Sequence, residues 1–297
     1  YTRKKLKIYS IGDPGDLTYP YQLIGSNTSI IREIVSGEHE ISNKIKKSKK
    51  PIVIIGESAL YGEIGQYIFE SLKSFLSANN FIKKDWNALN ILTQHASRVG
   101  AVDLEMYLIN ERENFPFFDK LDNNEFKFLY LLAADDIAVN KNDMFVVYQG
   151  SHGDKGAEIA DVILPGAAYT EKNGMFFNME GRLQKTYKAS YPPGEAREDW
   201  LIIKELSEKM KQPLNFKNHD QLCEQMLQSI QISQDIGDLP PTDDKRINFR
   251  EDVSFVEKEI AIKQIDYYHT NPIARSSKTM SECKQLSRTI FEKEKKV

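Results

Sequence analysis

The chain has few cysteines, little net charge and no long apolar run. Its two cysteines, Cys223 and Cys283, stand in no CxxC spacing, so the sequence predicts neither a disulfide framework nor a thiolate metal site. Lys and Arg number 40 against 43 Asp and Glu, and this balance excludes the strong basic field typical of nucleic-acid-binding proteins. The runs PIVIIG and FLYLLAA are far shorter than the roughly 18 to 20 residues that cross a bilayer, so we expect no direct membrane span.

Known catalytic signatures are also missing. The five histidines form no HExxH or other ligand spacing, and neither a GxGxxG nor a GxxxxGKS loop follows an early strand. No GxSxG elbow marks a serine nucleophile. The sequence opens at Tyr1 without the pattern of a targeting peptide, and we expect any such segment to have been removed or to lie outside this piece. The motifs therefore predict no catalytic residue and no metal ligand.

Apolar runs that end in glycine or acidic residues alternate with helical patterns. Segments dominated by apolar residues predict strands at 6–12, 51–56, 126–136 and 144–150. Apolar residues at helical spacing predict helices over 27–37, 62–79, 85–104 and 195–210, the first with a stop at Gly37. Such strands, separated by helices, are typical of a parallel sheet with both faces covered. The predicted fold is α/β, with an open, mostly parallel sheet covered by helices.

The composition changes in the last third of the chain. The sequence becomes polar beyond Pro213, and DLPPTDDKR at 238–246 is a break rich in proline and acid. We place a boundary between about Lys211 and Asp238, so that residues 1–212 form a partial α/β domain. Residues 213–297 are then expected to form a helical and extended C-terminal docking region.

The tail from about Ile265 has the pattern of a docking helix. Asn271-Pro272 favours a turn, and the apolar residues after it recur as a narrow helical stripe between basic side chains. So narrow a stripe buries too little surface for a core helix and suits a groove on a neighbouring surface. We therefore expect the tail to dock elsewhere and to lie outside the core.

Three glycines interrupt the aliphatic and aromatic stretch at 160–186. Gly166, Gly174 and Gly181 predict tight turns beside a cleft, because glycine is placed where φ is positive or where the backbone approaches another group closely. The acids of this stretch are a candidate acid/base set, although acids beside glycine and asparagine more often cap turns. They are Asp161, Glu171 and Glu180.

A glycine-bracketed loop, GSHGD at 150–154, directly follows a predicted strand. Open α/β sheets bind ligands at the carboxyl ends of their strands, where this loop is expected to lie. An ordinary crossover turn fits the same residues equally well.

One long stretch carries a specific family resemblance. VVYQGSHGDKGAEIADVILPGAAYTEKNGMFFNMEGRLQKTYKASYPPGEAREDW, residues 146–200, resembles the molybdopterin-oxidoreductase-like domain of the large iron-sulfur subunit (75 kDa type) of respiratory complex I. True molybdenum enzymes such as formate dehydrogenases share its ADVILPGAAYTEKNG and NMEGR in looser form. GDPGDLTYPYQLIG, DWNALNILTQHASRVGAVDLE and DYYHTNPIARSSKTMSEC resemble the complex I subunit and not those enzymes. The resemblance covers nearly all of residues 1–293.

The resemblance implies a structural, non-catalytic role in the NADH-oxidising module of complex I, which transfers electrons from NADH to ubiquinone. The family's amino-terminal half, which carries the iron-sulfur ligands, is absent from this sequence. Two isolated cysteines do not supply the four thiolates of a typical cluster, so we expect no cofactor on this chain and the iron-sulfur clusters on a partner N-terminal half. Other peripheral-arm subunits are the further expected partners, and the expected location is mitochondrial, on the matrix side of the inner membrane.

The resemblance also suggests the remains of a cofactor cleft. Its candidate residues are Gly150, His152, Gly166, Gly174, Asn178, Gly181 and Arg182. The bulky residues of GMFF at 174–177 are expected to fill the cleft, because side chains recover packing that an empty site loses. Two other interpretations stay open at this point. One is the C-terminal half of a molybdenum-pterin oxidoreductase with pterin bound near 166–182, and the other is a free-standing scaffold outside respiration.

Overall fold

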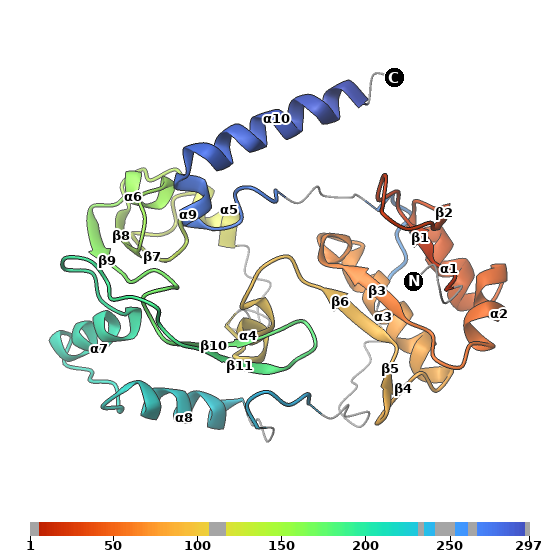
Figure 1. Cartoon of the computed structure of the whole chain (residues 1–297), viewed down its shortest axis with the longest axis horizontal. Coiled ribbons are helices and arrows are strands. Elements are labelled where there is room, and N and C mark those ends of the chain that lie inside the picture. Colours follow the sequence, from red (N-terminus) through yellow and green to blue (C-terminus); the bar gives the residue numbers. More distant parts are fainter. Residues whose placement is uncertain (1–5, 107–116, 231–234, 241–252, 261–265, 295–297) are drawn as a thin grey trace. The chain divides into compact units, whose positions relative to one another are not determined.

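The structure, a computed structural model, describes residues 6–106, 117–230, 235–240, 253–260 and 266–294, without the side chains of Phe118 and of 288–294. The chain divides into two compact units (Figure 1). Unit 1 comprises Tyr1–Arg98, Met179–Arg182 and Asp238–Ile265, and unit 2 comprises Val99–Asn178, Leu183–Gly237 and Asp266–Val297. The chain therefore passes from one unit to the other several times.

The described strands of unit 1 pair two by two. Parallel pairs join β1 (Tyr9–Ile11) with β2 (Gln22–Gly25) and β3 (Val53–Gly56) with β6 (Leu89–Leu92), and an antiparallel pair joins β4 (Ile82–Lys83) with β5 (Trp86–Asn87). The apolar segments at 6–12 and 51–56 contain β1 and β3, which confirms the prediction of strands there.

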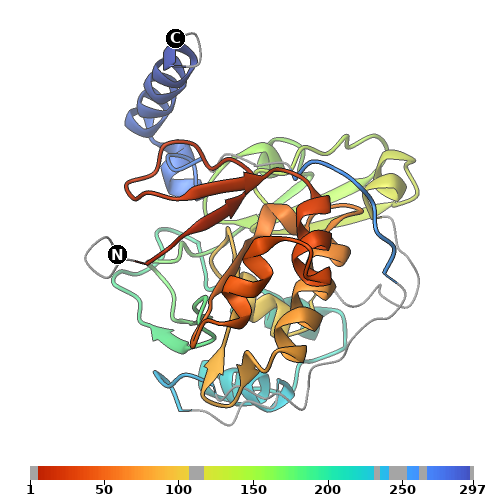
Figure 2. The ribbon, with the colours of Figure 1, turned by 90° about the vertical axis from the view of Figure 1, so that its right-hand side faces the viewer.

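The described helices of unit 1 lie between its strands along the sequence (Figure 2). They are α1 (Thr28–Ser36), α2 (Glu40–Lys46), the 3₁₀ helix η2 (Glu57–Leu60) and α3 (Gly65–Ala78). The side chain of Asn27 caps α1 by accepting a hydrogen bond from the backbone N–H of Ser29, and α1 ends at Gly37, whose φ is +92°. Both α1 and α3 turn apolar side chains into a common core, which includes the fully buried Ile31 and Ile68.

A three-stranded parallel sheet organises unit 2. It consists of β7 (Phe128–Leu132), β8 (Phe145–Gly150) and β9 (Val162–Pro165), with β8 in the middle. One face buries a core of Leu121, Leu131, Met144, Val146 and Tyr148. With its parallel strand pairs and interleaved helices, the chain is an open, mostly parallel α/β protein, as the sequence predicts.

The remaining elements of unit 2 are a hairpin and helices that range from the one-turn α6 to the long α10 (Figure 1). The hairpin pairs β10 (Gly174–Phe177) with β11 (Leu183–Thr186) in antiparallel register. The helices are α4 (Arg98–Asp103, from the last residue of unit 1), α5 (Phe117–Asp122), α6 (Lys155–Glu158), α7 (Asp199–Lys209), α8 (His219–Ser229), α9 (Pro272–Ser276) and α10 (Lys278–Glu294). Within the tail, α9 leads directly into α10.

The prediction of one helix over 85–104 is wrong. That segment contains β5 and β6, and only its end, from Arg98 to Asp103, is helical. Exposure alternates along β6, where Leu89 and Ile91 are partly buried and Asn90 and Leu92 are exposed. Backbone pairing with β3 decides the conformation, because it gives the apolar side chains of a short segment a sheet face to pack on.

Candidate functional site

The carboxyl ends of β7, β8 and β9 lie at one edge of the sheet in unit 2, because the three strands are parallel. Asp135 and Asp136 follow β7, the loop 151–154 follows β8, and Gly166 follows β9. The backbone N–H of Gly166 donates to the carbonyl oxygen of Gly150 at 2.9 Å. This carboxyl edge therefore brings together three of the predicted cleft residues, Gly150, His152 and Gly166, at the place where open α/β sheets bind ligands.

The loop at 150–156 encloses the ring of Tyr148. Tyr148 is 1% exposed, and its hydroxyl donates to the carbonyl oxygen of His152 at 2.8 Å. A Cβ atom on Gly150 would lie 2.2 Å from the Tyr148 hydroxyl oxygen, and one on Gly156 would lie 3.0 Å from the ring. Burial raises the pKa of Tyr148 to about 12, so the phenol stays protonated and keeps its donor. Gly150 and Gly156 thus make room for a side chain of the same protein.

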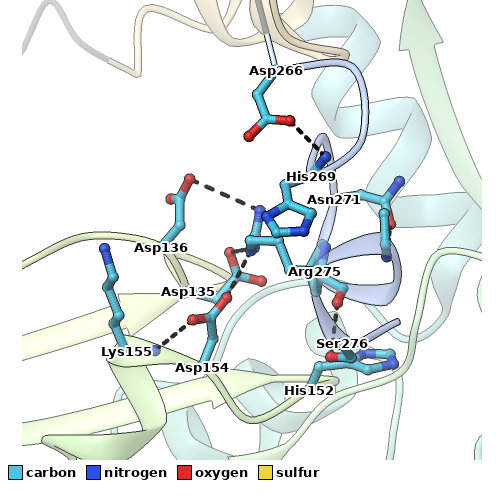
Figure 3. A network of polar contacts seen from close by, with 12 residues as sticks. Asp135, Asp136, His152, Asp154, Lys155, Asp266, His269, Asn271, Arg275 and Ser276 are labelled. Atoms are coloured by element: carbon cyan, nitrogen blue, oxygen red, sulfur yellow. Dashed lines mark hydrogen bonds and ion pairs between the residues drawn. The ribbon is translucent and has the colours of Figure 1, made fainter. Parts of the chain in front are cut away.

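An arginine from α9 binds the acids of the carboxyl edge (Figure 3). Nε of Arg275 donates to Asp154 Oδ2 at 2.7 Å, and Nη2 donates to Asp135 Oδ1 at 2.5 Å. Asp136 adds a longer ion pair, 3.9 Å from Nη1. The helix is set in place by Asn271, whose side chain accepts from the backbone N–H of Ala274 at 2.9 Å.

The two acids closest to Arg275 have pKa values shifted in opposite directions. Burial raises the pKa of Asp135, and its pairing with Arg275 only partly offsets that effect. Burial also opposes the charge of Asp154, but hydrogen bonds from Arg275 and from the backbone N–H of Lys155 outweigh it and lower the pKa of Asp154. Because a guanidinium is always charged, we treat both acids as carboxylates at neutral pH.

Asp154→Asn should therefore destabilise unit 2 at neutral pH and lose this effect in acid. A carboxyl whose pKa is lowered on folding stabilises the fold above its unfolded pKa, about 3.9, and that stabilisation disappears as the pH falls through the lower folded pKa. We expect the urea midpoint of the variant to lie below that of the wild type at pH 7, with the gap closing below about pH 4. A gap of constant size at every pH would contradict a role for the Asp154 charge.

A second polar cluster lies under the same edge. Gln149 is fully buried, and its Nε2 donates to Oδ1 of Asp199 at 2.9 Å and to the Asp199 carbonyl oxygen at 3.3 Å. Tyr130 donates its hydroxyl to the Gln149 side chain, and Lys172 pairs with the Asp199 carboxylate. A Cβ on Gly166 would lie 2.8 Å from Asp199 Oδ1. The chain's own groups thus satisfy this buried polar cluster.

The other four predicted cleft residues lie along the β10–β11 hairpin. Gly174 opens β10, and Asn178, Gly181 and Arg182 belong to the connection between the strands. Of the two reasons for glycine given by the sequence, a positive φ applies to Gly181, at +78°, and not to Gly166 or Gly174. Close approach explains those two glycines. A Cβ on Gly174 would lie 3.0 Å from the ring of Phe176, which folds back over it.

The three acids of 160–186 make local contacts. Asp161 accepts from the backbone N–H of Val146 at 2.8 Å and pairs with Lys141. Glu171 accepts from the backbone N–H of Ala168 at 2.9 Å. Glu180 lies 3.7 Å from Arg182, in the same hairpin connection. Glu171 thus caps its own turn, whereas Asp161 binds the backbone of β8 and Glu180 pairs with Arg182 in the hairpin connection.

The residues at the carboxyl edge do not fit a pterin cofactor that carries a phosphate. An anion requires free backbone or side-chain donors, whereas this edge presents the carboxylates of Asp135, Asp136 and Asp154. The guanidinium of Arg275 is already bound by those acids, and Tyr148 fills the space inside the loop. Among the described residues, no three His, Cys, Asp or Glu side chains are grouped so as to hold a metal ion.

Sequence reasoning missed the residues that define this edge. Arg275 lies 140 positions after Asp135 and 121 positions after Asp154, and no local sequence pattern predicts ion pairs between residues so far apart. Its one sequence signal is Asn271-Pro272, which has the form of an N-cap followed by proline at the first helical position. Nothing in the sequence indicated that Tyr148 fills the loop, because a tyrosine inside an apolar strand is expected to be an ordinary core residue.

Two family models match the chain. One, described as molybdopterin oxidoreductase, matches residues 1–209. The other, described as the C-terminal region of the NADH-ubiquinone oxidoreductase G subunit, matches residues 254–283. The chain therefore belongs to the molybdopterin oxidoreductase family.

Within this family, the chain is similar to subunits of NADH-quinone oxidoreductases. The chain is 37% identical over 293 residues to the NADH-ubiquinone oxidoreductase 75 kDa subunit of Reclinomonas americana, across 96% of this chain and 41% of that protein. It is 35% identical over 283 residues to the NADH-quinone oxidoreductase G subunit of Rickettsia bellii, across 94% and 39%. It is also 35% identical over 300 residues to the mitochondrial NADH-ubiquinone oxidoreductase 78 kDa subunit of Candida albicans, across 95% and 39%.

These relatives confirm the resemblance to the large subunit of NADH-quinone oxidoreductases. The chain spans about two fifths of the length of the relatives it matches, and the second family model places it at their C-terminal end. In the part of the chain that the structure describes, no helix combines the length and apolar character needed to cross a membrane.

Proposed function

We propose that the chain is a structural, non-catalytic part of the large iron-sulfur subunit in the NADH-oxidising module of respiratory complex I. It supports electron transfer from NADH to ubiquinone by the assembly and carries no redox centre itself. The observation that carries this proposal is the carboxyl edge of β7–β8–β9, where Tyr148 and Arg275 take the space and the charges that a ligand would use.

The iron-sulfur clusters then belong to a partner, the N-terminal half of the same subunit. The length of the relatives beyond the matched region supports such a partner. Unit 1 also supports it, because one face of the β3–β6 pair packs on α3 while the other exposes Ile52, Ile54 and Leu92 at 59%, 63% and 49%. Parallel sheets are usually covered on both faces, so this apolar face suits a neighbouring element.

The further partners in this proposal are other peripheral-arm subunits, with residues 213–297 as the docking region. Leu286 of α10 is 64% exposed and offers an apolar contact in the tail. The location is the matrix side of the mitochondrial inner membrane, in line with the relative from Candida albicans that is named as mitochondrial.

The match of residues 1–209 to the molybdopterin oxidoreductase family favours one alternative, the C-terminal half of a molybdenum-pterin enzyme. Molybdenum and iron analysis of the affinity-purified assembly distinguishes the two functions. Co-purification of complex I subunits with iron and without molybdenum is the expected result. About one molybdenum per chain would establish the alternative.

Gly181→Val should reduce the amount of assembled complex and leave its turnover unchanged. The φ of Gly181 is +78°, and a Cβ there would lie 3.0 Å from Pro240 Cγ, so a β-branched residue costs about 1 to 3 kcal/mol. The measurement is NADH:ubiquinone activity per assembled complex, with abundance read from native gels. Gly153→Val is the matched control, because a Cβ at Gly153 meets nothing within 4 Å. Normal abundance of the complex with lost turnover would show that Gly181 lies at a catalytically active site and would contradict the structural role.

A further inference from the structure

The residue that closes the carboxyl edge comes from a different segment than the edge itself. β7, β8 and β9 lie within residues 1–209, which match the molybdopterin oxidoreductase model. Arg275 lies within residues 254–283, which match the separate C-terminal model. A distinct segment of the chain therefore supplies the cation that binds the acids of this edge.

The two acids nearest to Arg275 suit a guanidinium better than another cation. Asp154 accepts from Nε and Asp135 from Nη2, so they bind different nitrogens of one planar group. A guanidinium presents its donors in a fixed plane, whereas an ammonium is a compact charge without that geometry. The side chains of Asp135 and Arg275 are 8% and 17% exposed, so little water competes for these hydrogen bonds.

We propose that the carboxyl edge of β7–β8–β9 is a guanidinium-binding site, and that the C-terminal segment is a plug that occupies it through Arg275. Asp135 and Asp154 define the specificity of the site, and Asp136 adds charge from its exposed position. All of these residues belong to unit 2. The proposal concerns what this edge binds, and it holds whichever assembly the chain joins.

The plug continues from the loop before α9 into α10. Asp266 accepts from the backbone N–H of His269 at 3.1 Å (Figure 3), and it also pairs with Lys284. The ring nitrogens of His269 lie 3.1 Å from Lys284 Nζ and 3.3 Å from Ser281 Oγ. These contacts hold the first turns of α10 on the loop, so release of Arg275 should free residues 266–287 as one stretch.

Arg275→Ala in the full chain tests the site by chemical rescue. Without the guanidinium, the buried carboxylate of Asp135 and the part-exposed one of Asp154 lose their partner, and we expect the amides of 272–287 to exchange hydrogen about tenfold faster or more. Ethylguanidinium, at a concentration too low to denature the protein, should bind the vacated carboxylates and restore slow exchange and the melting temperature. Ethylammonium at the same concentration should restore neither.

Two variants serve as controls. Arg275→Lys keeps the charge and lacks the planar fork, so it should give intermediate exchange without a response to ethylguanidinium. Arg197→Ala removes an arginine whose ion pair with Glu205, at 2.6 Å, joins side chains that are 59% and 54% exposed. Exposed pairs contribute little, so exchange in 272–287 should stay as in the wild type.

Unchanged exchange in Arg275→Ala, or equal rescue by ethylammonium, would overturn the guanidinium site. Should Arg275→Ala fail to fold, the neutral triple variant Asp135→Asn, Asp154→Asn, Arg275→Met removes both charges with their partner. We expect that variant to fold and its amides at 272–287 to exchange hydrogen rapidly. Ethylguanidinium should not change that exchange. A protected tail in the triple variant would contradict the plug.

Discussion

Gly150→Ala should destabilise unit 2 by about 3 kcal/mol, near the upper end of what overpacking costs. The added Cβ would stand 2.2 Å from the hydroxyl oxygen of Tyr148 and 2.4 Å from its Cζ. Tyr148 is 1% exposed and donates its hydroxyl to the carbonyl oxygen of His152, so the ring has no free space into which to move. Urea unfolding of the purified chain, followed by circular dichroism, measures the effect.

Gly153→Ala is the control for this prediction, because it lies in the same loop and a Cβ there meets nothing within 4 Å. Its free energy of unfolding should differ from that of the wild type by no more than about 0.5 kcal/mol. If both alanines destabilise the protein equally, the loop requires glycine for its backbone and not for Tyr148. If Gly150→Ala is fully stable, Tyr148 does not fill the loop and the edge is open to a ligand.

Three helices of the chain could be predicted from its sequence. Apolar spacing and Gly37 located α1, and spacing alone located α3 and α7 within a few residues. These signals are local, because a helix hydrogen-bonds within itself and ends where its own capping residue allows. The strands β7 and β8 were also predicted, since parallel strands are typically near-continuous apolar runs.

The segment 85–104 could not be assigned from local pattern. The spacing of its apolar residues is compatible with a helix. β6 forms instead because the backbone of Leu89–Leu92 hydrogen-bonds to β3. That pairing depends on a strand more than thirty residues earlier in the chain, from Val53 to Gly56. A short segment that fits both patterns takes the conformation that its tertiary partner selects.

The position of the carboxyl edge could be predicted from the sequence, but the side chains that occupy it could not. The sequence left the loop 150–154 open between a ligand site and an ordinary crossover turn, and in the structure Gly150 lies against a neighbouring group. A glycine gives the same signal for a ligand and for a buried side chain, so the sequence left open that the neighbour is Tyr148. Arg275 appeared as one of several basic residues flanking an apolar stripe, and only the structure pairs it with Asp135 and Asp154. This pairing ties the start of the predicted docking tail to the sheet.

Thr28→Val should loosen the segment around 256–260 on α1 and cost about 1 to 3 kcal/mol, because it leaves two part-buried backbone groups without their side-chain partner. Thr28 is fully buried in unit 1, 228 positions before Val256. Its hydroxyl donates to the carbonyl oxygen of Val256 at 2.6 Å and accepts from the backbone N–H of Lys258 at 3.1 Å. Valine has nearly the same shape as threonine and makes neither bond.

Thr28→Ser separates the two contributions of this residue. Serine keeps the hydroxyl and loses one methyl group, which is worth about 1 kcal/mol when buried. Hydrogen exchange of residues 253–260 and the urea midpoint measure both variants. We expect fast exchange and a large loss in Thr28→Val, with a small loss in Thr28→Ser, because the hydroxyl holds the backbone of Val256 and Lys258 in place. If serine destabilises more than valine, the methyl group anchors this segment through packing, and its hydrogen bonds contribute little.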